Sequence, residues 1–347
     1  MLILGIETSC DDTAAALVEA KAGRFRVIKN MIISQAKLHN KYGGVVPELA
    51  ARNHLKNIIP AIQEALGNTR PSEIDAIAVT AGPGLATSLH VGVETAKTLA
   101  YAWSIPLVGA NHMEGHILSV LLDSSHAITY PAVALIVSGG HTELVRMPKP
   151  GIYKLLGKTR DDAAGEAFDK SAFMLGLPYP GGPAISKAAQ KGDPKSFAIP
   201  RPMIERDNCE FSFSGMKNAI RLIVESYNRN SPSLVRRGQG GGSRLPVNDL
   251  AASIQQAIVD ILISKSLIAA AQAKPKTFIL AGGVAANTAL REQLAASLPK
   301  SVKLLTSSLG YSQDNAAMIA VGAYSAIKQK KFDSPESLTA NAHWELV

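Results

Sequence analysis

Residues Val133 to Met147 read Val-Ala-Leu-Ile-Val-Ser-Gly-Gly-His-Thr-Glu-Leu-Val-Arg-Met. This stretch predicts a buried strand, a turn over residues 138–141 and a second strand. Its adjacent glycines, Gly139 and Gly140, leave the backbone N–H groups open to a phosphate, and such turns form concave nests that bind anions. The alternative is an ordinary hairpin, because Gly-Gly between two apolar runs is a common turn.

A similar pattern opens the chain. Residues 2–7 predict an apolar strand, residues 8–12 a polar turn and residues 13–18 a second strand. A chain of 347 residues accommodates about two domains, and the later alternation of strands and helices predicts an α/β fold with mixed sheets. We therefore expect a duplicated fold that holds a ligand between an N-terminal lobe (1–130) and a C-terminal lobe (131–347). The helices near 314–330 are candidates to return to the first lobe.

The amino-acid composition limits which class of protein and which kind of binding partner we expect. With 46% hydrophobic and 18% charged residues the chain is globular, and with only 5% aromatic residues base stacking is a poor main binding mode. The net charge of +8 favours an anionic partner such as nucleic acid, or describes a merely basic enzyme. The two cysteines lack CxxC spacing, which fits a reducing cytosol. No signal peptide or long uninterrupted apolar run is present, so we expect a cytoplasmic protein without a membrane span.

Residues 228–247 are rich in Gly, Ser and Arg and contain no acid. Two interpretations stay open, a solvated flexible loop and a contact with an RNA backbone. The arginines concerned are Arg229, Arg236, Arg237 and Arg244.

His112 and His116 stand four residues apart in a predicted helix over 112–122, with Asn111 as its N-cap. The spacing puts both imidazoles on one helix face, which suits one metal ion but also occurs in ordinary helices. Glu114 lies about 200° round the helix from His112, so a zinc-peptidase mechanism explains the pair poorly. Asp314, at another predicted helix start, is either the third ligand or a helix cap. Two histidines and one carboxylate leave coordination positions open for substrate.

Three common kinds of site are excluded, because the sequence does not contain their motifs. G-x-G-x-x-G, the phosphate-binding G-x-x-x-x-G-K-[ST] and the G-x-S-x-G elbow of serine hydrolases are all unmatched.

Taken together and in order, the motifs of residues 2 to about 330 resemble the TsaD family of tRNA N6-adenosine threonylcarbamoyltransferases. The matching segments are Gly5-Ile-Glu-Thr-Ser-Cys-Asp-Asp-Thr13, Asn111 with His112 and His116, Val137-Ser-Gly-Gly-His-Thr142, Gly165-Glu-Ala-Phe-Asp-Lys170, Tyr179-Pro-Gly-Gly-Pro183, Phe211-Ser-Phe-Ser-Gly215, Gly282-Gly-Val-Ala-Ala-Asn287 and Asp314-Asn315.

The resemblance implies a two-lobed fold of the actin, hexokinase and Hsp70 type with a central ligand cleft. It implies transfer of the threonylcarbamoyl group from threonylcarbamoyl-AMP to N6 of the adenosine 3′ of the anticodon, in tRNAs that read codons starting with A. It further implies a TsaB-like paralogue and a TsaE-like ATPase as partners, and one Fe²⁺ per subunit, with Zn²⁺ as the alternative ion in isolated protein. The implied ligands of the ion are His112, His116 and Asp314.

Most of the remaining site residues implied by the resemblance contact the adenylate. The resemblance places phosphate and carbamoyl contacts at Val137, Ser138, Gly139, Gly140 and His141 and nucleoside contacts at Asp169, Gly182 and Asn287. Asp11 and Asp12 are candidate proton acceptors.

The chain departs from the family pattern at two positions. Many relatives have Glu where this chain has Asp12, and Thr often stands where this chain has Gln313.

Two other functions are kept as alternatives. One is a phosphotransferase of the same fold superfamily, and the other is an ATP-regulated scaffold protein. Sites of those proteins usually hold Mg²⁺ through carboxylates and water rather than through two histidines on one helix. A metallopeptidase is disfavoured by the position of Glu114.

Overall fold

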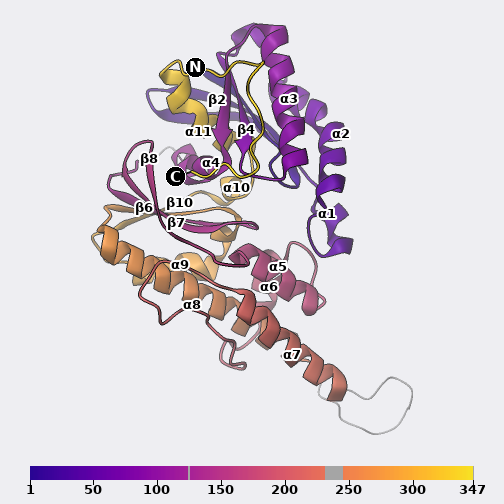
Figure 1. Ribbon diagram of the computed structural model, residues 1–347, viewed down its shortest axis with the longest axis vertical. Helices are drawn as coiled ribbons and strands as arrows, with labels where there is room; N and C mark the ends of the chain where they lie inside the picture. The colour runs from indigo at the N-terminus through magenta and orange to yellow at the C-terminus, as the bar shows by residue number, and fades with distance from the viewer. Residues whose placement is uncertain (124–125, 231–244, 347) are drawn as a thin grey trace.

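The computed structural model describes residues 1–123, 126–230 and 245–346, which form two lobes stacked along the long axis of the molecule (Figure 1). Each lobe holds a five-stranded mixed sheet, in the orders β3-β2-β1-β4-β5 and β10-β9-β6-β7-β8. β1 to β3 are antiparallel neighbours, and β4 and β5 join β1 in parallel. β6 to β10 repeat this plan in the same order. The duplication predicted from the two strand-turn-strand units is confirmed.

The strands predicted from apolar runs are found, with shifted ends. β3, β8 and β10 escaped prediction, because β3 and β8 are edge strands with many exposed polar residues and β10 is an edge strand of only four residues. The strands are β1 (Leu2–Glu7), β2 (Asp12–Lys21), β3 (Arg24–Ser34), β4 (Ala76–Gly82), β5 (Leu107–Asn111), β6 (Ala132–Val137), β7 (Thr142–Lys149), β8 (Ile152–Lys158), β9 (Thr277–Ala281) and β10 (Lys303–Thr306).

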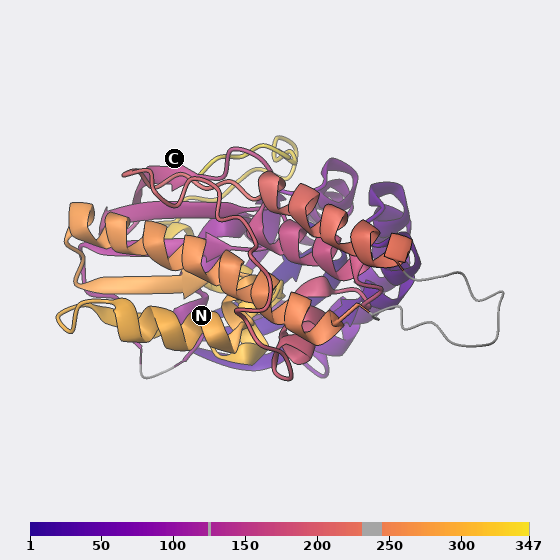
Figure 2. The same cartoon turned by 90° about the horizontal axis from the view of Figure 1, so that it is seen from below.

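Helices cover both faces of each sheet (Figures 1 and 2). The α-helices are α1 (Ala36–His39), α2 (Pro47–Leu66), α3 (Ala86–Trp103), α4 (His112–Leu118), α5 (Ala164–Met174), α6 (Gly181–Ala189), α7 (Ser214–Asn230), α8 (Val247–Ala273), α9 (Thr288–Ser297), α10 (Leu309–Ser312) and α11 (Ala316–Lys328). Short 3₁₀ helices are η1 (Asn40–Tyr42), η2 (Pro71–Glu73), η3 (Ser119–Leu122) and η4 (Gly283–Ala286).

The alternation of side chains along β1 separates the two layers of the first lobe. Leu4 and Ile6 face a core formed with α2 and α3, whereas Ile3 faces a core formed with α11. Gly5 also faces α11, and a Cβ at this position would lie only 2.1 Å from the carbonyl oxygen of Ala316. The last helix of the chain therefore packs directly on the backbone of the first strand.

Helix α4 lies at the junction of the lobes. Met113 and Ile117 pack into the core on one face of the second sheet, together with residues of β6, β7 and β9. On its other side α4 crosses α11 at a pair of glycines, where a Cβ on Gly322 would lie 3.4 Å from the Cα of Gly115. Small residues allow the two backbones to approach closely, so α4 is held by both lobes.

Helix α8 is long and apolar enough to cross a membrane by length and composition, with a mean hydropathy of 1.4 over its most apolar window. In this fold, 56% of that window is buried inside the protein. Leu250, Ile254 and Ile261 belong to the large core of the second lobe. Such burial is typical of a core helix.

The predicted helical stretch over 112–122 is confirmed, and it consists of α4 followed directly by η3. Of the two roles considered for Asp314, that of a helix cap is taken by its neighbour. Asn315 caps α11, because its side chain accepts a hydrogen bond from the N–H of Met318. Of the predicted basic loop, the residues up to Asn230 continue α7, while Arg236, Arg237 and Arg244 lie outside the described residues.

Candidate active site at the junction of the lobes

The two histidines predicted to share a helix face lie one turn apart on α4, and their ring centroids are 4.6 Å apart. Asn111 caps the helix as predicted, its side chain accepting hydrogen bonds from the N–H groups of Met113 and Glu114. Asp314 reaches the histidines from the segment before α11. Its Oδ1 lies 3.1 Å from His116 Nε2 and 3.6 Å from His112 Nε2. The structure thus brings together residues that are some 200 positions apart in the sequence.

Glu7 orients the first of these histidines. Its side chain is fully buried at the end of β1, where it accepts hydrogen bonds from Thr80 Oγ1 at 2.6 Å, from His112 Nδ1 at 3.0 Å and from the N–H of Ser9. With Nδ1 engaged by a carboxylate, Nε2 of His112 is left facing Asp314. This is how metal-binding histidines are commonly held. Sequence reasoning missed Glu7, although a lone acid ending an apolar strand was the available signal.

The donor atoms fit a divalent metal ion. One atom each from His112, His116 and Asp314 lie within 4.8 Å of one another. Both ring nitrogens of His116 are buried and make no well-formed hydrogen bond to the described residues, although the Asp314 carboxylate lies 3.1 Å from Nε2 and a buried polar atom normally has a partner. Two imidazoles and one carboxylate form the donor set of many open iron(II) sites. The residues present therefore fit a metal ion, as the resemblance implies.

Electrostatics within the cluster follow from burial and pairing. Burial acts to lower the pKa of His112, but the carboxylates of Glu7 and Asp314 outweigh it and raise this pKa to about 9. Burial also lowers the pKa of His116. Although burial acts to raise it, the pKa of Asp314 is held below its usual range by the two histidines. Without a metal ion, the Asp314 carboxylate therefore stays charged and His112 carries a proton, which a bound ion would displace.

The turn between β6 and β7 presents an open surface. The N–H of Ser138 donates to the carbonyl of His141 at 2.9 Å, and the N–H of His141 donates to Ser138 Oγ. A Cβ on Gly139 or Gly140 would meet nothing within 4 Å, whereas one on Gly165, beneath the turn, would lie 2.4 Å from the carbonyl oxygen of Ser138. The inner side is thus closely packed and the outer side is free for a ligand.

The backbone at these two glycines differs from that of most anion nests. Anion nests usually alternate right- and left-handed residues, but neither Gly139 nor Gly140 has a positive φ. These glycines contribute open space instead of a left-handed backbone. His141 follows them, and burial, together with the charge of His112, lowers the pKa of His141 to about 4, so its imidazole is neutral.

The three residues implied as nucleoside contacts have different surroundings. Asp169 Oδ1 accepts a hydrogen bond from the N–H of Gly181 at 2.6 Å, and burial raises the pKa of Asp169 to about 6. Gly182 faces open space. The side-chain amide of Asn287 already makes two hydrogen bonds within the protein, because its Oδ1 accepts from the N–H of Leu290 as the cap of α9 and its Nδ2 donates to Gln255. Only one N–H and one lone pair of that amide remain for a ligand.

The first-lobe turn, equivalent to residues 138–141 of the second lobe, carries Asp11 and Asp12. Asp11 Oδ2 accepts a hydrogen bond from the hydroxyl of Tyr179 at 3.3 Å, and the N–H of Tyr179 donates to Asn40 Oδ1 at 2.8 Å. These bonds join the lobes at the rim of the site. Burial and the neighbouring charge of Asp11 raise the pKa of Asp12 to about 7. Asp12 can therefore gain or lose a proton near neutral pH.

Comparison with known proteins agrees with this geometry. The sequence profile described as "TsaD: tRNA N6-adenosine threonylcarbamoyltransferase" matches residues 26–321. A curated tRNA N6-adenosine threonylcarbamoyltransferase of Thermomicrobium roseum is 49% identical, across 100% of this chain and 97% of the relative. One of Geotalea daltonii is 47% identical, across 92% of this chain and 90% of the relative. The chain belongs to the TsaD family.

The fold is found outside the TsaD family as well. A crystal structure of T. kodakarensis HypF, 14% identical in sequence, superposes with a TM-score of 0.55 over 97% of this chain and 49% of that one. The predicted two-lobed α/β fold with duplicated mixed sheets is thereby confirmed.

The side chain of Glu114, which lies between His112 and His116 in the sequence, points away from both histidines. Its Oε1 accepts a hydrogen bond from the hydroxyl of Tyr153 at 2.6 Å, and burial raises its pKa. The carboxylate is thus engaged with β8 of the second lobe. This position agrees with the inference that a zinc-peptidase mechanism does not explain the histidine pair.

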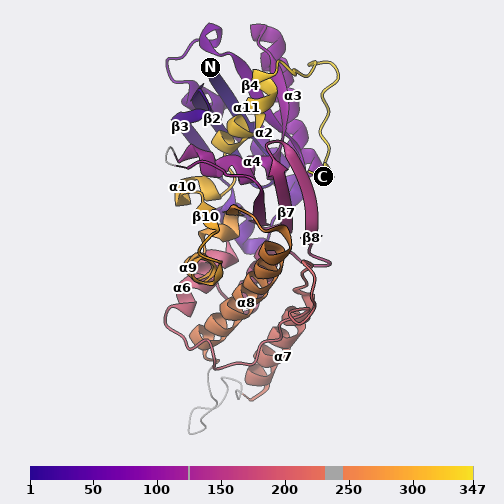
Figure 3. The same cartoon turned by 90° about the vertical axis from the view of Figure 1, so that its left-hand side faces the viewer.

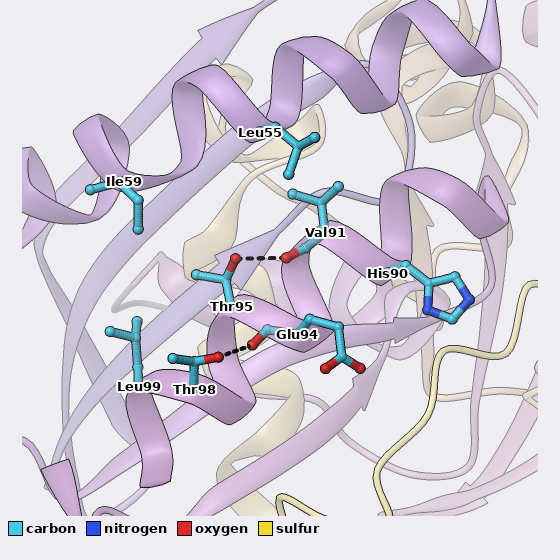
Figure 4. Close-up of a pocket in the computed structure, with 8 residues that line it drawn as sticks. All are labelled: Leu55, Ile59, His90, Val91, Glu94, Thr95, Thr98 and Leu99. Atoms are coloured by element: carbon cyan, nitrogen blue, oxygen red, sulfur yellow. Dashed lines mark hydrogen bonds between the residues drawn. The ribbon is translucent and has the colours of Figure 1, made fainter. Parts of the chain in front are cut away.

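A separate groove lies on the outer surface of the first lobe, between α2 and α3 (Figure 4). Its volume is 460 Å³. Leu55 and Ile59 are 65% and 47% exposed there. α2 and α3 cover the face of the first sheet opposite to α11, so this groove takes no part in the chemistry at the histidine cluster. It is lined by Leu55, Ile59, His90, Val91, Glu94, Thr95, Thr98 and Leu99.

Proposed function

We propose that this protein transfers the threonylcarbamoyl group from threonylcarbamoyl-AMP to N6 of the adenosine 3′ of the anticodon, in tRNAs that read codons starting with A. Membership of the TsaD family supports the proposal. The structural observation that carries it is that His141, at the end of the open turn, lies close enough to His112, His116 and Asp314 for their charges to act on its imidazole. A phosphotransferase or scaffold protein has no need of this ligand set, and neither alternative is favoured.

In the proposed reaction, the N6 lone pair forms a bond to the carbamoyl carbon. The bond from that carbon to the phosphate oxygen breaks, and AMP leaves with the electron pair. The proton lost from N6 passes to a carboxylate, for which Asp12 is suited by its pKa of about 7 and Asp11 by its position beside it. Because an exocyclic adenine amine is a weak nucleophile, positioning of both reactants contributes much of the rate.

His112, His116 and Asp314 would hold the Fe²⁺, or Zn²⁺ in isolated protein. When bound, the ion supplies a Lewis acid that polarises the acyl phosphate and neutralises charge on the departing AMP. The residues around it have fixed tasks. Glu7 keeps His112 in the tautomer that presents Nε2, and the capped first turn of α4 keeps both histidines on one face.

The adenylate would lie across the second-lobe side of the cleft. The backbone from Val137 to His141 would receive the phosphate and the carbamoyl end, where the glycines leave room for them. Asp169, Gly182 and the remaining N–H of Asn287 would contact the nucleoside. Asp169 also fixes the 181–182 backbone through its bond to Gly181, so its proposed role includes shaping this part of the site.

The tRNA itself would be bound chiefly through its phosphates. A net charge of +8 provides backbone attraction, whereas 5% aromatic residues provide little for base readout. We therefore expect the cytoplasmic protein to act with partners, a TsaB-like paralogue and a TsaE-like ATPase. Multiple-turnover modification by this chain with only the adenylate-forming enzyme would contradict the partner requirement.

The test of the activity is a mass-spectrometric analysis of tRNA nucleosides. tRNA would be incubated with threonine, bicarbonate, ATP and the adenylate-forming enzyme, with and without this protein and the partners. We expect threonylcarbamoyladenosine only when this protein is present. A complete mixture that yields no modified adenosine above the control without this protein would refute the proposal.

A further inference from the structure

The described residues after α11, 329–346, contain no helix or strand and run beside the first lobe as an extended segment (Figure 3). The N–H of Asp333 donates to the carbonyl of Leu107, and its carboxylate accepts from the N–H of Gly109. Further along, the N–H of Asn341 donates to the carbonyl of Ala81 at 2.7 Å. The segment thus follows β5 and the end of β4 toward the cleft.

At the junction of the lobes the segment contacts both of them. Trp344 packs against the core under α2 and α3 of the first lobe. Leu346 packs against the core that contains Met113 and Ile117 of α4 and the inner face of the second sheet. Glu345 forms an ion pair with Lys158 of β8 at 3.1 Å, but both side chains are more than half exposed. The apolar contacts therefore dominate this bridge.

Asn111 joins this segment to the histidine helix. Its side chain is buried, its Nδ2 donates to the carbonyl of Trp344 at 3.1 Å, and its Oδ1 accepts from Met113 and Glu114 in the first turn of α4. The amide is planar, so fixing one end fixes the direction of the other. The next residue is His112. The orientation of the metal-binding helix is thus tied to the docked C-terminal segment.

We propose that residues 341–346 are a positioning element for the metal site, and that docking of this segment and metal binding at His112, His116 and Asp314 reinforce each other through Asn111. The inference rests on the metal site of the proposed function, not on the tRNA reaction. Coupling between two binding events is reciprocal, so each must strengthen the other by the same factor. Both directions can therefore be measured without tRNA.

The decisive variant is Asn111→Ser. Serine is as good an N-cap as asparagine, so the first turn of α4 keeps its acceptor, but the shorter side chain lacks the amide N–H that bonds Trp344. We expect Co²⁺ affinity, measured by the visible absorption of the bound ion, to fall about three- to tenfold, the range for losing one buried hydrogen bond. Trp344→Ala removes the docking contact from the other side and should lower the affinity likewise. Glu336→Gln, at an exposed side chain of the same C-terminal segment but outside residues 341–346, is the matched control and should bind Co²⁺ as wild type does.

Amide hydrogen exchange tests the reverse direction. Saturating Co²⁺ should slow exchange at Asn341 in the wild type and leave it unchanged in Asn111→Ser. Wild-type Co²⁺ affinity in both Asn111→Ser and Trp344→Ala, with no effect of Co²⁺ on exchange, would overturn the inference while leaving the metal site standing. A wild-type protein that binds no Co²⁺ would overturn the metal assignment as well.

Discussion

The contact between the first strand and the last helix allows a test of how the fold sets the metal site. Gly5 of β1 faces the N-terminus of α11, and a Cβ there would lie 2.1 Å from the carbonyl oxygen of Ala316. Real Cβ atoms essentially never approach closer than 3.0 Å, so in Gly5→Ala the oxygen must retreat by about 0.9 Å. Ala316 is only two residues from Asp314. Metal sites tolerate deviations of about 0.2 Å in ligand distance.

We therefore expect Gly5→Ala to weaken Co²⁺ binding at least about tenfold, a loss of about 1.4 kcal/mol. Overpacking should also lower the free energy of unfolding by about 1–3 kcal/mol. Titration by visible absorption and urea unfolding measure the two effects. Gly310→Ala is the matched control, because it lies close to Asp314 in sequence yet its Cβ would meet nothing within 4 Å. If Gly5→Ala bound Co²⁺ as tightly as Gly310→Ala does, the position of Asp314 would not depend on this contact.

Three further outcomes are expected. His116→Ala should lose most of the bound metal, since a site with only two ligands left is weak. If elemental analysis found unchanged metal content in the double variant His112→Ala, His116→Ala, the assignment of these residues as metal ligands would be wrong. Gly140→Val should keep the fold, because a Cβ at this position would meet nothing within 4 Å, yet abolish adenylate binding. Calorimetry showing undiminished binding would place the adenylate elsewhere. For Asp12 the folded-state pKa of about 7 lies above the usual 3.8, so the proton stabilises the folded state at low pH and this contribution is lost as the pH rises through 7. Between pH 5 and pH 8, the free energy of unfolding of the wild type, measured by urea unfolding, should therefore fall by about 2–3 kcal/mol more than that of Asp12→Asn. Parallel pH profiles of the two proteins would contradict the raised pKa.

Much of the fold could be predicted from local pattern. The two strand-turn-strand units, the pair His112 and His116 and the cap Asn111 each follow from residues close in sequence, and all are found in the structure. The polar edge strands β3 and β8 could not be predicted in this way, because their neighbours in the sheets, rather than their own hydrophobicity, make them strands.

The surroundings of the site were less predictable, since they depend on contacts between distant segments. Glu7 reaches His112 only because β1 and the start of α4 lie side by side. Asn287 resembles a free ligand contact in sequence, yet the fold uses its amide for a helix cap and for Gln255. Asp314 and Asn315 are equally good caps by residue type, and only the direction of the entering chain leaves the carboxylate free for the histidines.

The duplicated sheets place two equivalent turns at the same cleft, one after β1 and one after β6. The first carries the carboxyl groups of Asp11 and Asp12, and the second carries Gly139 and Gly140 followed by a neutral imidazole. Two copies of one backbone design thus bring carboxyl groups from one lobe and a neutral imidazole from the other to the junction of the lobes. On the proposed function, a substrate with an anionic phosphate at one end and a proton-losing amine at the other would be repelled in one orientation and accommodated in the reverse one.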